Sequence, residues 1–236
     1  MNGAPKKKTS PWVYVAIGCG GIVVLALLAI GGIAVFAYRK GKQMEAEMKD
    51  PVARAAKVRE VLGGDMPPGY HPVFSMSIPL VMDMAMLGDQ PPDEKGQPNK
   101  RMDGGFMYIS SIAMGSQQDE LKRYFEGTLD DPEALRRANI HVDSQETIRR
   151  GSIDIPGQQT LYLAQRGTFA MNQTSSQGLT SLILVDCPQD GRQRLGIWFG
   201  PDPAPDKAVE SVDWSGSVAD EAAMRAFMGH FQLCGR

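Results

Sequence analysis

One long stretch near the N-terminus contains no charged residue. The run from Trp12 to Tyr38 consists of apolar and small residues. A helix rises about 1.5 Å per residue, so this run exceeds the roughly 20 residues that cross a hydrocarbon core. Trp12, Tyr14 and Tyr38 lie near its ends, where amphipathic rings favour the membrane interface. The pattern predicts a transmembrane helix over residues 12–38, with the lipid bilayer as its partner.

Two other interpretations of this run are weaker. A cleaved secretory signal would need a small-residue site, for which Val35-Phe36-Ala37 qualifies, but the apolar run before it is longer than in such signals. A lipid-modified Cys19 would need a short apolar stretch before it, whereas here the longer stretch follows. We therefore expect an uncleaved anchor preceded by a basic tail over residues 1–11.

A helical pattern follows the predicted span. Asp50 suits the N-cap and Pro51 the first helical position, and Gly63 suits the end of the helix. We predict a helical stalk over residues 39–64, which joins the membrane helix to a folded domain over residues 65–236.

The folded domain begins with a run in which every second residue, from Met76 to Met86, is apolar. Alternation with period two is typical of a strand. Pro79 interrupts this strand and predicts an edge or a bulge there. The polar segment 88–105 is the expected place for a binding loop, and a further strand is predicted over residues 106–113. The alternating apolar positions are Met76, Ile78, Leu80, Met82, Met84 and Met86.

Helices and strands are grouped separately in the remaining chain. Helices are predicted over residues 117–126 and from Asp131 to about Ala138. A third helix is predicted to run through His230, with Ser217 and Asp220 placed to cap its start. The predicted strands cover 143–154, 159–167, 179–186 and 193–199. Such grouping favours an α+β class, with an antiparallel sheet packed with helices. The order of elements resembles the α-β-α sandwich of PsbP-like proteins, which implies the layers and no function.

Charge is distributed unevenly along the 236 residues. The first 42 residues hold six Lys and Arg and no acid, so the remainder has 19 basic against 27 acidic residues, a net charge of −8. Nucleic acids require a basic surface, so we expect no nucleic-acid partner. An acidic domain also gains no attraction to anionic lipid.

The cysteines indicate on which side of the membrane the folded domain lies. The predicted domain contains only Cys187 and Cys234, and one such pair suits a disulfide in an oxidising compartment. Two free thiols are the alternative. Basic residues flank both ends of the span equally, so charge decides the orientation only weakly. We expect a single-pass inner-membrane protein with its C-terminal domain outside the cytoplasm.

Several residues of the sequence could support chemistry. Cys187 as a phosphatase nucleophile would need an arginine at position 193, where Gln stands. Cys187, His230 and Cys234 could ligate a metal, but they lack paired Cys-x-x-Cys spacing. Five arginines near predicted strand ends could line an anion site: Arg149, Arg150, Arg166, Arg192 and Arg194. We expect structural or surface roles for all of these residues.

Methionines offer one further site. Met82, Met84 and Met86 point the same way on a strand, and thioethers are soft ligands for Cu(I). Methionine also packs well in irregular cores, which is the simpler interpretation. The sequence contains no G-x-S-x-G, P-loop or dinucleotide fingerprint, and we expect no cofactor.

These observations favour a membrane-anchored, non-enzymatic binding or assembly domain in a bacterial envelope. One alternative is an enzyme whose active site is assembled from distant residues. The other is Cu(I) binding through Met82, Met84 and Met86.

Overall fold

The computed structural model describes residues 49–93, 96–99, 101–112, 116–131, 133–137, 143–171, 174–187 and 191–234. The predicted tail, the predicted span 12–38 and the first part of the predicted stalk lie outside these ranges. Within the described ranges, no helix combines the length and apolar character needed to cross a bilayer. The fold is α+β, as predicted from the grouping of helices and strands.

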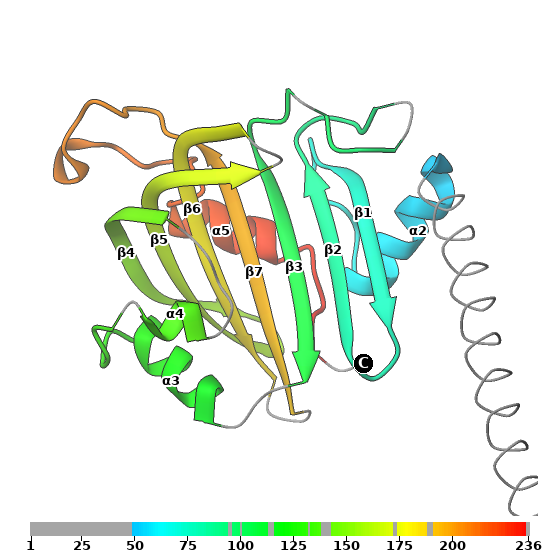
Figure 1. Ribbon diagram of the computed structural model, residues 1–236, viewed down its shortest axis with the longest axis horizontal. Helices are drawn as coiled ribbons and strands as arrows, with labels where there is room; N and C mark the ends of the chain where they lie inside the picture. The colour runs from blue at the N-terminus through cyan, green and yellow to red at the C-terminus, as the bar shows by residue number, and fades with distance from the viewer. Residues whose placement is uncertain are drawn as a thin grey trace, which may run out of the picture. The chain divides into compact units, whose positions relative to one another are not determined.

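Seven strands form one antiparallel sheet in the order β1-β2-β3-β7-β6-β5-β4 (Figure 1). Two meanders, β1 to β3 and β4 to β7, meet where β7 pairs with β3. Strands β1 and β4 are therefore the two edges. The strands are β1 (His71–Ile78), β2 (Met82–Gly88), β3 (Gly105–Ile112), β4 (Asp143–Ile155), β5 (Gln158–Met171), β6 (Thr174–Asp186) and β7 (Arg192–Pro201).

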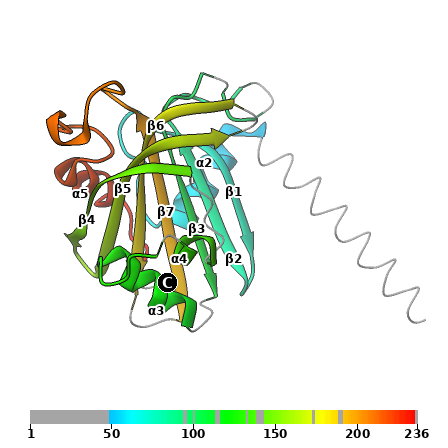
Figure 2. The same ribbon diagram turned by 60° about the vertical axis from the view of Figure 1, so that its left-hand side comes forward.

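Helices cover the two faces of the sheet unequally. Helices α2 (Pro51–Leu62) and α5 (Glu221–Met228) pack on one face, which we call the α5 face. Helices α3 (Ser116–Phe125) and α4 (Glu133–Arg137) pack on the other, the α3 face. Figures 1 and 2 show α3 and α4 on the side of the sheet opposite α5. The one described 3-10 turn is Val209–Ser211.

Aromatic side chains dominate the core on the α5 face. The rings of Trp198 and Phe227 stack with centroids 4.5 Å apart, and Phe106 stacks on Phe231 at 5.4 Å. Tyr70 accepts a 2.7 Å hydrogen bond from the Trp198 indole N–H. These contacts fix α5 and the following segment on the centre of the sheet, where such ring pairs add to area burial.

Leucines form the core on the α3 face. Helix α3 inserts Leu121 and Phe125, both fully buried, among Leu163, Leu182 and Leu195 of strands β5, β6 and β7. This cluster covers the β5–β7 half of the face. The β1–β2 half of the α3 face carries different side chains, described below.

Helix α2 belongs to the domain core. Asp50 caps it by accepting a 2.9 Å hydrogen bond from the Val52 N–H, and Gly63 ends it with a φ of 72°. Val58 and Leu62 are buried in the α5-face cluster. This part of the predicted stalk 39–64 is therefore packed against the sheet.

The structure corrects two local predictions. The alternating run from Met76 to Met86 forms two strands, because Pro79 and the residue after it make a tight turn rather than a bulge. The final helix is capped by Asp220, which accepts from the Ala222 N–H. Ser217 instead stabilises the preceding turn, where its hydroxyl donates to the Trp214 carbonyl.

Candidate functional site

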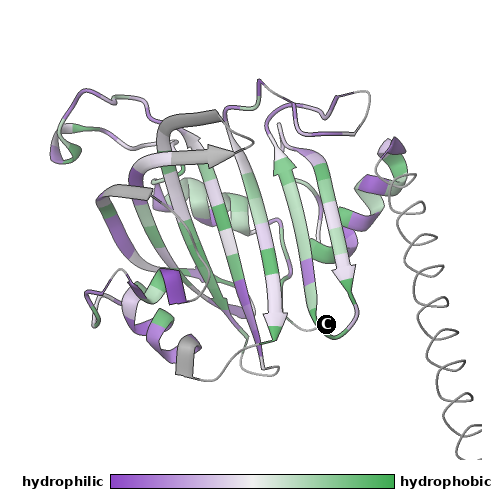
Figure 3. Cartoon of the chain, viewed as in Figure 1, coloured by the Kyte–Doolittle hydropathy of each residue, from purple (hydrophilic) through white to green (hydrophobic). Residues whose placement is uncertain are grey.

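Exposed apolar side chains gather at one end of the sheet. Among the described residues, five large hydrophobic side chains are exposed, and four of them lie at the β1–β2 turn or at the end of β3. We call these four the apolar end: Ile78 (41% exposed), Leu80 (85%), Val81 (51%) and Ile112 (57%). The fifth, Val52, lies on α2. Figure 3 shows hydrophobic colouring at the β1–β2 turn and at the tip of β3.

Strand register makes the apolar end continuous. Met82 of β2 pairs with both Ile78 of β1 and Ser111 of β3. The next position outward on β2 is Val81 and the next on β3 is Ile112, so these two residues lie side by side. A contiguous exposed apolar patch of this kind marks an interaction surface more often than scattered single residues do.

The β1–β2 turn holds its leucine in an unfavourable conformation. The Val81 N–H donates to the Ile78 carbonyl at 3.0 Å, with Pro79 and Leu80 between them. Pro79 suits the second position of such a turn, whereas the third position favours Gly or Asn. Leu80 has a φ of 65°, the one positive φ at a non-glycine residue in the described ranges. A strained backbone that exposes a leucine is evidence for a functional role.

A methionine face adjoins the apolar end. Alternate residues of β2 point to the α3 face, and their partners on β1 and β3 point the same way. Met84 lies opposite Met76, and Met86 lies opposite Met107. Met86 is buried and the others are partly exposed. The methionine face consists of Met76, Met82, Met84, Met86 and Met107.

The other residues of β2 point to the core. Ala85 and Leu87 are fully buried on the α5 face. The three predicted methionines therefore share one face, as alternation requires, but it is the face opposite the α5-face core. Sequence reasoning missed Met107 as a neighbour because it lies on another strand, 21 residues from Met86 in the chain.

Polar side chains lie on the α5 face at the same end of the sheet. Asp83 forms a 2.8 Å ion pair with Arg192 and accepts a hydrogen bond from the Ser77 hydroxyl. Tyr108 of β3 and Arg194 of β7 are buried. Burial raises the pKa of the Tyr108 hydroxyl, and the Arg194 guanidinium opposes that rise. The phenol is therefore neutral at physiological pH and serves as a structural hydrogen-bonding group.

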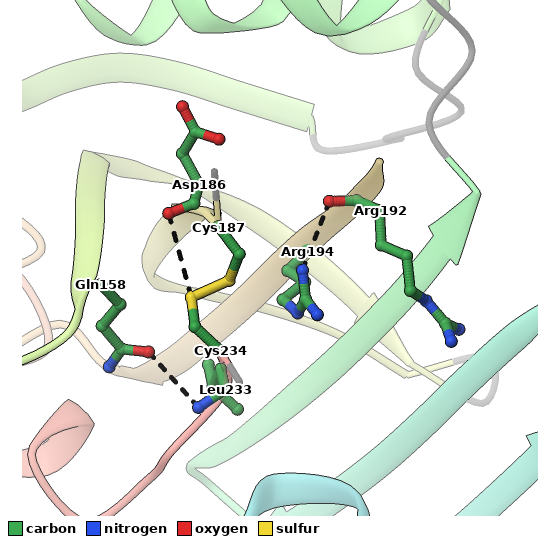
Figure 4. The surroundings of a disulfide bond; sticks show 7 residues. All are labelled: Gln158, Asp186, Cys187, Arg192, Arg194, Leu233 and Cys234. Carbon is green, nitrogen blue, oxygen red and sulfur yellow. Dashed lines mark hydrogen bonds between the residues drawn. A yellow bond between two sulfur atoms is a disulfide. The ribbon is translucent and has the colours of Figure 1, made fainter. Parts of the chain in front are cut away.

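Cys187 and Cys234 lie at disulfide distance, with their Cα atoms 5.5 Å apart (Figure 4). Such a bridge joins the end of β6 to the last described residues of the chain. Gln158 supports it by accepting a 3.4 Å hydrogen bond from the Leu233 N–H, and Asp186 pairs with Lys122 at 3.0 Å. A bonded Cys187 has no thiolate for the nucleophilic role considered from the sequence.

The described residues contain no group of three or more His, Cys, Asp or Glu side chains placed to hold a metal. The arginines considered for an anion site are divided among strands β4, β5 and β7. Arg166 pairs with Asp202 at 2.7 Å, and Arg150 lies 5.5 Å from the Tyr124 ring centre. Arg192 and Arg194 share one face of β7, where Arg192 is paired with Asp83.

Sequence reasoning missed Leu80, Val81 and Ile112 as surface residues. The available signal was Pro79 followed by two apolar residues, which is unusual in a turn. Comparison with known protein families and with curated proteins finds no match.

Proposed function

We propose that this chain is a membrane-anchored, non-enzymatic binding protein of a bacterial envelope, and that the apolar end is its contact surface for an apolar segment of another protein. The observation that carries this proposal is the gathering of Ile78, Leu80, Val81 and Ile112 at one end of the sheet. Exposing four large apolar side chains together opposes solubility, and a bound partner would relieve that cost.

Three further observations support this proposal. The uncharged run 12–38 in the sequence supports an anchor. The cysteine pair at disulfide distance supports an oxidising compartment. The net charge of −8 beyond residue 42 disfavours insertion of the apolar end into anionic lipid, so a protein is the better partner.

The test is site-specific photocrosslinking of the full-length chain in intact cells. A photoreactive residue would replace Leu80, Val81 or Ile112, and Val52 is the matched control because it is equally apolar and 78% exposed. The proposal predicts one adduct of the same mass from all three positions and none from Val52. Equal adducts from Val52, or no adduct at the apolar end, would reject it.

Cu(I) binding is a second candidate because of the register of the methionine face. Directly opposed residues in an antiparallel pair have Cβ atoms about 5 Å apart, whereas same-face neighbours on one strand are roughly 7 Å apart. The cross-strand pair Met76 and Met84 therefore suits a shared ion better than Met82 with Met84. Met107 opposite Met86 offers a second such pair.

This second candidate is tested by titrating the full-length protein in detergent with Cu(I) against a chromophoric chelator. Replacing both Met76 and Met84 by Leu should abolish retention, whereas Met82→Leu should have little effect. Equal affinity in the wild type and the double variant would reject a methionine site.

A further inference from the structure

The two edges of the sheet differ in how they are protected. Strand β4 contains Asp143, Glu146, Arg149, Arg150 and Asp154, and two register shifts interrupt its pairing with β5. Charges and bulges of this kind prevent an edge from pairing with another chain. Strand β4 is therefore a protected edge.

Strand β1 has almost none of these features. Its eight residues, HPVFSMSI, include no acid, lysine or arginine. Pro72 and one register shift disturb only its first part, before Phe74. From Phe74 to Ile78 the pairing with β2 is regular, and no second described strand pairs with β1. An uncharged, regular edge that no second described strand covers is a template for another strand.

We propose that β1 pairs with β1 of a second copy of this chain, so that two sheets join edge to edge around a two-fold axis. A two-fold axis perpendicular to the sheet makes the two strands antiparallel and keeps equivalent faces on the same side. Opposed residues must then share a face, which requires the register to centre on a residue. Centring on Met76 places Phe74 opposite Ile78 of the second copy, and Ser75 opposite Ser77.

A second copy fits this edge better than an unrelated chain for two reasons. Every opposed pair in this register is apolar with apolar or hydroxyl with hydroxyl, so the strand is complementary to itself. The remainder of the chain is acidic, with a net charge of −8 beyond residue 42, so two copies repel at most other surfaces. An edge without charge is where that repulsion is smallest.

Pairing would also extend the methionine face. Met84 lies opposite Met76 within one sheet. The two-fold register continues this row across the junction into Met76 and Met84 of the second copy. Of the apolar end, Ile78 lies in the opposed segment, whereas Leu80, Val81 and Ile112 lie outside it. The dimer therefore does not depend on the contact proposed for these three residues. The two proposals can therefore fail separately.

The test is cysteine crosslinking of the full-length chain in membranes, in a Cys19→Ser background. Directly opposed Cα atoms in an antiparallel pair are about 4.5–5.5 Å apart, within the range of a disulfide. Single Cys substitutions at Ser75, Met76 and Ser77 report the register. Thr147→Cys, on the protected edge β4, controls for crowding in the membrane and for proximity through the anchor.

We expect Met76→Cys to give a crosslinked dimer of twice the chain mass, with about tenfold less at Ser75 and Ser77 and none above background at Thr147. Ile78→Lys added to Met76→Cys should lower the dimer yield about tenfold, because two lysines then flank the junction, whereas Val52→Lys should leave it unchanged. Equal yields at Met76 and Thr147 would overturn the proposal. An adduct of a different mass at Met76 would also overturn it, by identifying a foreign strand as the partner.

Discussion

The Asp83 carboxylate lies 2.8 Å from the Arg192 guanidinium, although 109 residues separate them in the chain. Asp83 is on β2 and Arg192 on β7, so the ion pair spans the intervening strand β3. Both side chains are about three-quarters buried. The contact ties the β1–β2 hairpin to the centre of the sheet, and so helps to hold the apolar end in place.

Removing this ion pair should loosen the hairpin. We expect Asp83→Asn to lower the free energy of unfolding by about 1–2 kcal/mol, because a partly buried guanidinium loses its carboxylate. Chemical denaturation followed by circular dichroism measures the change. Arg225→Gln is the control, since its 2.7 Å pair with Glu221 is more exposed and should contribute at most about 0.5 kcal/mol. An equal loss of unfolding free energy in both variants would show that the Asp83–Arg192 pair does not stabilise the hairpin.

Leu80→Gly should separate folding from binding. Glycine adopts a positive φ without steric cost, so the variant should be as stable as the wild type or up to about 1 kcal/mol more stable. The same change removes the most exposed large apolar side chain of the apolar end. We therefore expect the photocrosslinked adduct formed through Ile112 to weaken while the thermal midpoint holds or rises. A lower midpoint would mean that Leu80 is needed for folding.

Breaking the Cys187–Cys234 pair should destabilise the fold. A bridge across a sequence separation of 47 residues adds about 4 kcal/mol in the chain-entropy treatment. We expect Cys234→Ser to lower the unfolding free energy by an amount approaching this value. Reductant should destabilise the wild type similarly and leave the variant unchanged. If reductant has no effect on the wild type, the two thiols are not joined in the protein.

Asp89 should make stability depend on pH. Burial raises its pKa above the ordinary value of 3.8, although the Gly104 N–H donates to its carboxylate. The folded state therefore holds this proton more tightly than the unfolded state does. The resulting stabilisation is complete below pH 3.8 and is lost as the pH rises through the raised pKa.

Asp89→Asn tests this effect, because the amide oxygen can still accept from Gly104. We expect the variant to be at least as stable as the wild type at pH 7, with the difference shrinking as the pH falls through the raised pKa of Asp89 toward 3.8. Urea denaturation of both proteins at each pH measures the difference. A variant that is less stable only at pH 7 would show that the charged carboxylate favours folding.

Local pattern was sufficient for much of the fold. Capping by Asp50, the strand over residues 105–112 and the presence of the final helix α5 were all readable, because each depends on residues within a few positions. The alternation of methionines correctly placed Met82, Met84 and Met86 on one face of a strand. It could not distinguish one strand from two, since Leu80 fits the alternation and only the turn geometry excludes it.

By itself, the sequence determined the α+β class, most of the helices and strands, and which residues share a face, because backbone periodicity is a local property. Only the tertiary structure decided the strand order and therefore the neighbours. It placed Ile112 beside the β1–β2 turn, Met107 opposite Met86, and Arg192 against Asp83. It also left β1 as an edge. Exposure and cross-strand contact depend on pairing between distant segments, and no local pattern encodes that pairing.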